Sequence, residues 1–302
     1  MALENAPGTP AYSGNFIPQI WSLNLLVKFY ATSVLYDISN TDYEGEIKDM
    51  GDVVQIRTTP DVTIKDYVKG QTIKPELLTS PKIDLAIDKG KYFYFQIDDV
   101  DKHQSDIDLM SDWSEDAAEQ MKITIDTQVL STVYSQVHAS NTGATAGAIN
   151  ADINLGTTAA PLNITKSNVL DYLIDYGTVL YEQNVPESNR WVVIPPWMAG
   201  MIQKSELRDA SVSGESSTLK NGRLGMIGTF TIYVSNLMTT ASAKTEVIFG
   251  HKSALSFASQ ITEMDYFDKL ENTFGKAIRG LNVYGFEVLK TEAMGHSVVT
   301  KG

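Results

Sequence analysis

The sequence predicts an α+β fold in which β-rich stretches and one long helix occupy separate parts of the chain. Residues 51–98 alternate apolar with polar residues, which is the period of half-buried strands, and a second β-rich stretch runs from about Leu255 to Val288. Between them, apolar residues recur at steps of four from Trp113 to Val137 without Gly or Pro. This pattern predicts a helix of about 38 Å at 1.5 Å per residue.

The N-terminal region predicts an arm followed by a short helix. Residues 1–15 contain two prolines and two glycines with few apolar residues, which favours an extended conformation. The apolar positions from Ile20 to Val34 fit a short amphipathic helix with Pro18 near its first turn. We expect this arm and helix to dock onto another surface.

Residues 51–98 predict several short strands joined by turns. The middle of this stretch, Tyr67 to Pro81, contains lysines but has little to pack on, so we expect it to project from the body. The alternating positions that predict strands are Val54 and Ile56, Val62 and Ile64, Ile83, Leu85 and Ile87, and Phe93, Phe95 and Ile97.

The long helix and the elements after it have clear local signals. Asp112 and Glu115 have the spacing of a capping box, which predicts a helix that starts with Asp112 as N-cap. A second helix is predicted from Val169 to Tyr181. The buried-type strand Arg190–Ile194 is stopped by two prolines, and a short helix, residues 197–205, and the strands Phe230–Val234 and Glu246–Phe249 follow.

Composition excludes several classes of protein. The chain has 302 residues, no cysteine, 24 basic and 37 acidic side chains, and a net charge of −13. The absence of cysteine rules out thiol catalysis, cysteine-ligated metals and disulfides. The acidic balance argues against a protein that grips nucleic acid through its phosphates.

No targeting or membrane segment is predicted. The start, Met-Ala-Leu-Glu-Asn, lacks the basic and apolar regions of a secretory signal, so we expect synthesis in the cytoplasm. The longest uncharged, largely apolar run, residues 191–202, contains two prolines and is shorter than the roughly 20 residues that span a bilayer. We expect no membrane partner.

No motif predicts catalysis or cofactor binding. An acidic cluster could chelate Ca²⁺ or Mg²⁺. Counted from Asp99 or Asp106, however, it lacks Gly at position six and Glu at position twelve of an EF-hand, which favours a solvated strand-to-helix junction. No nucleophile elbow or phosphate-binding loop occurs. The aromatic run Tyr92–Phe95 favours core packing over base stacking. The cluster comprises Asp98, Asp99, Asp101, Asp106, Asp108, Asp112, Glu115 and Asp116.

Motifs in a characteristic order resemble the major capsid protein of tailed bacteriophages, which has the HK-ninety-seven-like capsid fold. They are spread over most of the chain, and their order is more specific than any one of them. The motifs are Phe16–Ser22 with Leu25-Leu26, Tyr43–Ile47, Gly51–Ile56, Arg190–Pro195, Gly225–Phe230, Tyr233–Asn236, Gly250–Ala254 with Phe257-Ala258, and Arg279–Gly285 with Val288.

The resemblance implies a division of the chain and a structural role. It implies a shell that self-assembles from hexamers and pentamers into an icosahedral head around double-stranded DNA, with no catalytic residue, cofactor or metal. The implied parts are an N-terminal arm (1–50), an extended β-loop (51–98), a peripheral domain with the long spine helix (99–185), an axial domain (186–275) and a return strand of the peripheral domain (276–302).

The implied partners are other copies of the chain and the remaining components of a phage head. Because only about 15 residues precede the first motif, we expect a separate scaffolding protein, together with a portal protein, packaged DNA held without sequence specificity and, in some heads, a decoration protein. Shells of a nanocompartment with the same fold, another virion component such as a tail tube, and an unrecognised hydrolase are the alternatives. The candidate contacts between subunits are Trp21, Leu25, Tyr67, Lys69, Lys74 and Leu77.

Overall fold

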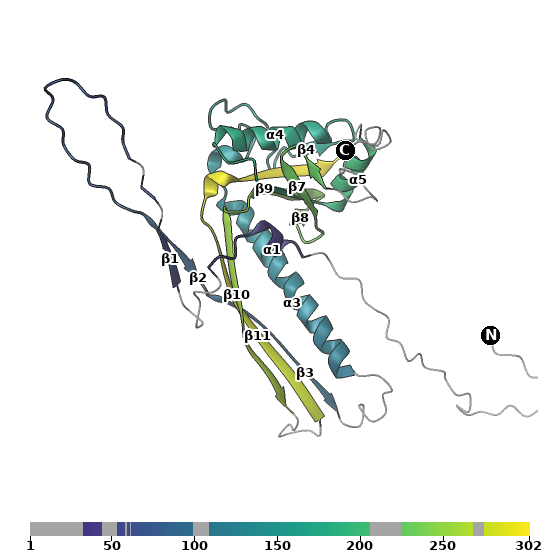
Figure 1. Ribbon diagram of the computed structural model, residues 1–302. Coiled ribbons are helices and arrows are strands. Elements are labelled where there is room, and N and C mark those ends of the chain that lie inside the picture. The colour runs from purple at the N-terminus through teal and green to yellow at the C-terminus, as the bar shows by residue number, and fades with distance from the viewer. Residues whose placement is uncertain are drawn as a thin grey trace, which may run out of the picture.

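The computed structural model describes residues 33–43, 53–57, 59–60, 62–98, 109–205, 225–267 and 275–302. Figure 1 shows a compact body, a long sheet that runs beside a long helix, and a hairpin that carries a loop away from both. Helices and strands are both abundant, so the predicted mixed fold is confirmed.

The body is built on a seven-stranded mixed sheet. Its strand order is β4-β12-β9-β5-β7-β6, with β8 paired to β9, and the β12–β4 and β5–β7 pairs are parallel. The strands are β4 (Leu162–Ile164), β5 (Arg190–Ile194), β6 (Met226–Ile227), β7 (Phe230–Val234), β8 (Thr240–Ala241), β9 (Lys244–His251) and β12 (Met294–Lys301).

Two helices flank this sheet, and both follow from the sequence pattern. Helix α4 (Val169–Glu182) packs its apolar stripe on the sheet, where the ring of Tyr176 stacks on Phe249 at 4.5 Å between centroids. Strand β5 is buried along its whole length and ends before the two prolines, as predicted. Helix α5 (Pro196–Lys204) begins one residue before the predicted range 197–205, with Pro at its first position, where the missing N–H costs no hydrogen bond. These elements contribute a large part of the main hydrophobic core.

The second sheet is long, antiparallel and three-stranded, in the order β10-β11-β3. It joins β3 (Lys89–Asp98), β10 (Leu255–Phe267) and β11 (Gly275–Val288), so segments almost 200 residues apart lie side by side. The spine helix α3 (Leu109–Val133) runs along one face of this sheet (Figure 1).

The spine helix has the predicted length but an earlier start. It begins at Leu109, not after Asp112, so the capping-box prediction is wrong. The residues from Leu109 to Ser111 include no Gly or Pro that would prevent the helix from extending toward its N-terminus. At the other end, a 3₁₀ turn over Tyr134–Gln136 follows directly.

A two-stranded hairpin, β1 (Val53–Arg57) with β2 (Lys82–Ala86), begins the projecting part of the chain. The strand predicted around Val62 and Ile64 does not form. The chain there pairs with no other strand, and both side chains are exposed. The aromatic residues of β3 lie on two faces of the strand. Phe93 and Phe95 face the spine helix, whereas Tyr92 and Tyr94 are exposed. The predicted core packing is therefore correct only for the two phenylalanines.

Within the described residues, no helix is long and apolar enough to cross a membrane.

Candidate assembly surface

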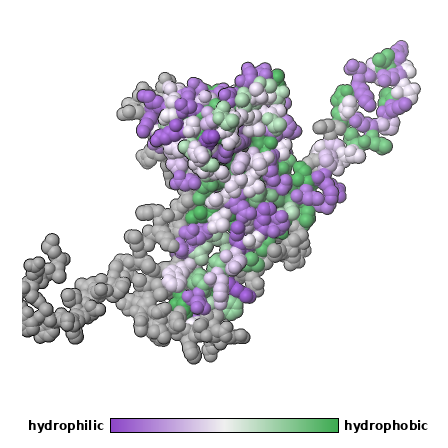
Figure 2. Space-filling view, turned by 180° about the vertical axis from the view of Figure 1, so that it is seen from behind, coloured by the Kyte–Doolittle hydropathy of each residue, from purple (hydrophilic) through white to green (hydrophobic). Residues whose placement is uncertain are grey.

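The most prominent surface feature is the projecting loop, defined as residues 59–60 and 62–81. It leaves the body at the end of the β1–β2 hairpin and contains no helix or strand (Figure 1). Figure 2 shows apolar and polar residues intermixed on its surface. The loop projects, as its sequence predicts.

Large apolar side chains are concentrated on this loop although it buries none of them. Exposed apolar residues are common singly on protein surfaces, but a dense group of them marks an interaction site. Seven lie within this short segment: Val62, Ile64, Tyr67, Val68, Ile73, Leu77 and Leu78, with exposed fractions from 45% for Leu78 to 94% for Leu77.

The loop is held in shape by a few polar contacts. The hydroxyl of Thr63 donates to a carboxylate oxygen of Glu76 at 3.0 Å, and the Thr63 amide donates to the other oxygen at 3.3 Å, which ties the two legs together. At the far end, the amide of Gln71 donates to the Val68 carbonyl at 3.0 Å, and Gly70 takes the positive φ of 89° that this turn requires.

The base of the loop is anchored on the three-stranded sheet by a small separate core. Leu85 and Ile87 pack against Ala258 and Val283, and all four side chains are buried. The backbones approach so closely that a Cβ added at Gly285 would collide with the Ala86 carbonyl oxygen. A fixed base and an exposed end make the loop suited to reaching another molecule.

The predicted contact residues on the loop lie in this exposed segment. Tyr67 and Leu77 are 70% and 94% exposed, and the lysines Lys69 and Lys74 are exposed as well. Two further candidates, Trp21 and Leu25, lie outside the described residues.

A second surface lies where the arm meets the spine helix. The carboxylate of Asp126, on α3, accepts the amide of Val34 at 2.8 Å and that of Leu35 at 3.4 Å, at the start of helix α1 (Leu35–Ile38). Burial raises the pKa of Asp126, although hydrogen bonds from Val34, Ser33 and Leu35 oppose this effect. A buried carboxylate therefore fixes the end of the arm to the spine.

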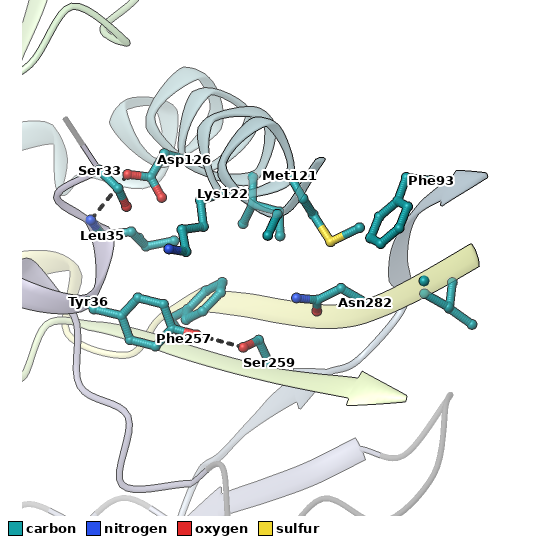
Figure 3. Close-up of a pocket in the computed structure, with 14 residues that line it drawn as sticks. Ser33, Leu35, Tyr36, Phe93, Met121, Lys122, Asp126, Phe257, Ser259 and Asn282 are labelled. Carbon is teal, nitrogen blue, oxygen red and sulfur yellow. Dashed lines mark hydrogen bonds between the residues drawn. The ribbon is translucent and has the colours of Figure 1, made fainter. Parts of the chain in front are cut away.

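Further contacts hold the same arm segment against the long sheet. The Tyr36 hydroxyl and the Ser259 hydroxyl are 2.8 Å apart, and the Tyr36 ring meets Phe257 edge-on at 5.4 Å. Figure 3 shows these residues at one end of an open cavity between α3 and the sheet. Sequence patterns gave no signal for the cavity or for Asp126, because the partners of Asp126 lie about 90 residues away in the chain.

One histidine makes the contacts of a catalytic triad, but its surroundings indicate a structural role. His296 Nε2 lies 2.5 Å from a Glu246 carboxylate oxygen, and its Nδ1 lies 3.1 Å from the Thr142 hydroxyl. The ring rests on Tyr134, and neighbouring Asn141 donates to two backbone carbonyls near the start of β12. These contacts join the turn around residue 141 to strands β12 and β9 of the body sheet.

No metal centre is found in the parts of the chain that the structure describes, since no three His, Asp or Glu side chains group there as ligands would. The acidic residues 99–108 lie outside those parts, so the expected solvated junction stays a prediction.

Solved structures with a similar fold describe the class of protein that this fold represents. The structure of Mycobacterium phage Che8 superposes with a TM-score of 0.76 at 25% identity, covering 94% of this chain and 97% of that one. The capsid of cyanophage P-SCSP1u gives 0.67 at 16% identity over 95% and 93% of the two chains. The capsid of a native GTA particle gives 0.68 at 14% identity over 99% and 100%. The fold is therefore that of phage capsid subunits.

The family model described as phage capsid protein matches residues 82–295. The chain belongs to this family, and it is a major shell protein of a phage capsid. No curated protein matches it.

Proposed function

We propose that copies of this chain assemble through hexamers and pentamers into the icosahedral head of a tailed phage, which encloses double-stranded DNA. The observation that carries the proposal is the projecting loop, whose seven apolar side chains have a rigid base but nothing to pack on in their own subunit. Burying such side chains against a neighbour would contribute about 25 cal/mol per Å² of apolar surface.

We also propose boundaries for the parts named by the resemblance, and strand pairing supports them. Strand pairing favours an extended loop of β1, β2 and the segment between them, with β3 assigned to the peripheral domain beside β11 and the spine helix. It also favours an axial domain that includes β12, a strand of the seven-stranded sheet, and α4, which packs on that sheet. The expected ranges 51–98, 99–185, 186–275 and 276–302 would shift accordingly.

The proposed partners follow from the same role. A separate scaffolding protein would set the curvature, a portal protein would occupy one vertex, and assembly would take place in the host cytoplasm. The net charge of −13 favours DNA held by confinement with few phosphate contacts. A decoration protein on the outside would be an addition in some heads. The role is structural and needs no cofactor.

Electron microscopy of the purified full-length chain tests this function. The expected result is closed or irregular shells, irregular because no scaffolding protein is present to control curvature. Particles recovered from an infection should be DNA-filled heads. A small shell without DNA would favour a nanocompartment, and tubes would favour a tail component. A monodisperse 33.2 kDa monomer across micromolar concentrations and salt would overturn the proposal.

A further inference from the structure

The body and the long part of the molecule are joined by a narrow connection, where the long part means the three-stranded sheet together with the spine helix. Among the described elements, no strand of that sheet and no stretch of that helix makes an extensive contact with a helix or strand of the body. The chain crosses between the two parts at residues 134–141, 252–254 and 289–293, which we call the joint. A few residues between packed elements can absorb a change in angle, so a joint of this kind can act as a hinge.

Helix α1 lies at this joint and is bound to both elements of the long part (Figure 1). Asp126 of the spine helix accepts the amides at the start of α1. The Tyr36 ring packs edge-on against Phe257 of β10. Just after the helix, Asn40 pairs with Ser256 on the outer edge of β10, close to the point where that strand leaves the joint. The position of α1 is therefore fixed relative to the long part.

The same helix reaches the body. Leu35 and Ile38 are fully buried in the main hydrophobic core, which continues through the body sheet. Tyr233 of body strand β7 packs against this core. Burial raises the pKa of the Tyr233 hydroxyl, and the negative charge of Asp37 raises it further, which requires Asp37 to lie near that strand. Helix α1 therefore lies between the spine helix, the long sheet and the body.

Helix α1 depends on these surroundings for its own shape. It is a single turn of four residues, and an isolated turn is not stable in water because its nucleation is unfavourable. No side chain at its own N-cap, Val34, accepts its free amides, and the carboxylate of Asp126 accepts them instead. The helical turn and its docked position are therefore gained or lost together.

We infer that docked α1 fixes the angle between the body and the long part, and that a subunit whose α1 has left the joint can vary this angle. In a shell, the angle decides how the two parts of one subunit meet its neighbours, so α1 holds each subunit at the curvature that the scaffolding protein sets. This consequence for shells rests on the proposed function, whereas the effect on the angle is a property of the single subunit.

Distances between two spin labels test the angle in unassembled subunits. The chain has no cysteine, so labels can be placed by Asp171→Cys on α4 of the body and Glu115→Cys near the far end of the spine helix, both at exposed positions. Pulsed electron spin resonance then gives the distribution of distances between the labels. The undocking variant combines Leu35→Lys with Ile38→Lys, because unpaired charges cannot stay in the core. The matched control is Asp42→Lys, at an exposed position just after α1.

We expect one narrow distribution for the labelled parent and for Asp42→Lys, and a roughly twofold broader one for the undocking variant, because a freed joint samples several angles. Circular dichroism confirms that the undocking variant is folded. An equally narrow distribution in the folded undocking variant, or a broad one in the parent, would overturn the inference and leave the shell function standing. A wild-type chain that never forms shells would overturn the proposed function but not the effect of α1 on the angle.

A milder variant gives a second readout if the undocking variant does not fold. Asn40→Pro removes the amide that donates to the Leu255 carbonyl and adds no charge to the core. Asn40→Ala is its matched control, because it keeps that amide. The distance distribution of Asn40→Pro should be broader than that of Asn40→Ala. Equal distributions for the two folded variants would contradict a role of the docked helix in fixing the angle.

Discussion

Asp126 is the residue on which attachment of the arm to the spine depends. It is 2% exposed and accepts amides from the first residues of the arm that the structure describes. Its buried negative charge costs free energy, which is why its pKa rises, but its Oδ2 satisfies two amides that would otherwise be unpaired at the start of α1.

The raised pKa predicts a specific pH dependence. An acidic group whose pKa is higher in the folded state than in the unfolded state stabilises the folded state most when the group is protonated. This stabilisation is lost as the pH rises through the folded-state pKa. Asp126→Asn keeps an acceptor for Val34 but removes the titration. The stability of the wild type relative to Asp126→Asn should therefore increase as the pH falls from neutral into the acid range.

Chemical denaturation of unassembled subunits at several pH values measures this difference. Asp126→Ala is the control, because it leaves the Val34 amide without an acceptor and should cost about 1–3 kcal/mol relative to Asp126→Asn at every pH. A constant difference between wild type and Asp126→Asn across pH would show that the carboxylate does not titrate there.

Trp113 illustrates the limit of reading burial from a sequence pattern. Its position in the four-residue repeat predicts a packed ring, but the side chain is 41% exposed and meets Phe95 edge-on at 6.0 Å. We expect Trp113→Ala to cost about 1–2 kcal/mol of unfolding free energy, less than the 3–5 kcal/mol of a buried ring. Val129→Ala, at a fully buried position of the same helix, should cost about 2 kcal/mol or more. A larger loss for Trp113→Ala than for Val129→Ala would contradict this assignment.

At the scale of elements, the hairpin that carries the loop is positioned by a close approach of two backbones. Gly285 of β11 faces Ala86 at the end of β2, where no side chain fits. Gly285→Ala should push the hairpin off the sheet and destabilise the subunit by about 1–3 kcal/mol. Thermal unfolding of Gly285→Ala measures the effect.

Gly200 provides the matched control for this prediction. It lies in α5 with open space around it, so Gly200→Ala should be neutral or stabilising by up to about 1 kcal/mol. If Gly285→Ala were as stable as Gly200→Ala, the hairpin would have to be free to shift on the sheet.

Elements with strong local signals could be predicted, and pairings could not. Two prolines after Ile194 end β5, and the lack of Gly and Pro after Leu109 permits one long helix, because both signals act on the backbone nearby. The pairing of β3 with β11 depends on residues almost 200 positions apart, and local period says nothing about it. Likewise, the projecting loop follows from the sequence, but the cavity needs the arm, the spine helix and the sheet together.

At the scale of the whole molecule, the lysines in and beside the projecting loop are exposed to solvent. A covalent bond between a loop lysine and a neighbour's asparagine would require an uncharged amine in a desolvated pocket. Lys65, Lys69 and Lys74 of the loop and Lys82 at the start of β2 are all exposed, and Lys82 lies 3.7 Å from the Asp84 carboxylate. We expect no covalent cross-link between subunits.

Boiling mature particles in detergent checks this expectation. A single band near 33.2 kDa is the predicted outcome. A ladder of multimers that disappears when one of those four lysines is changed to Ala would show instead that a neighbour supplies the apolar pocket.

The central claim is that the projecting loop joins subunits into a shell without contributing to the folding of its own subunit. Replacing residues Tyr67 to Pro81 by a Gly-Ser turn tests it most directly, with circular dichroism and denaturation to follow folding and electron microscopy to follow assembly. Because the side chains removed are exposed, the shortened chain should remain folded with stability near that of the wild type, yet form no shells. A shortened chain that assembles into wild-type shells, or one that no longer folds, would contradict the account.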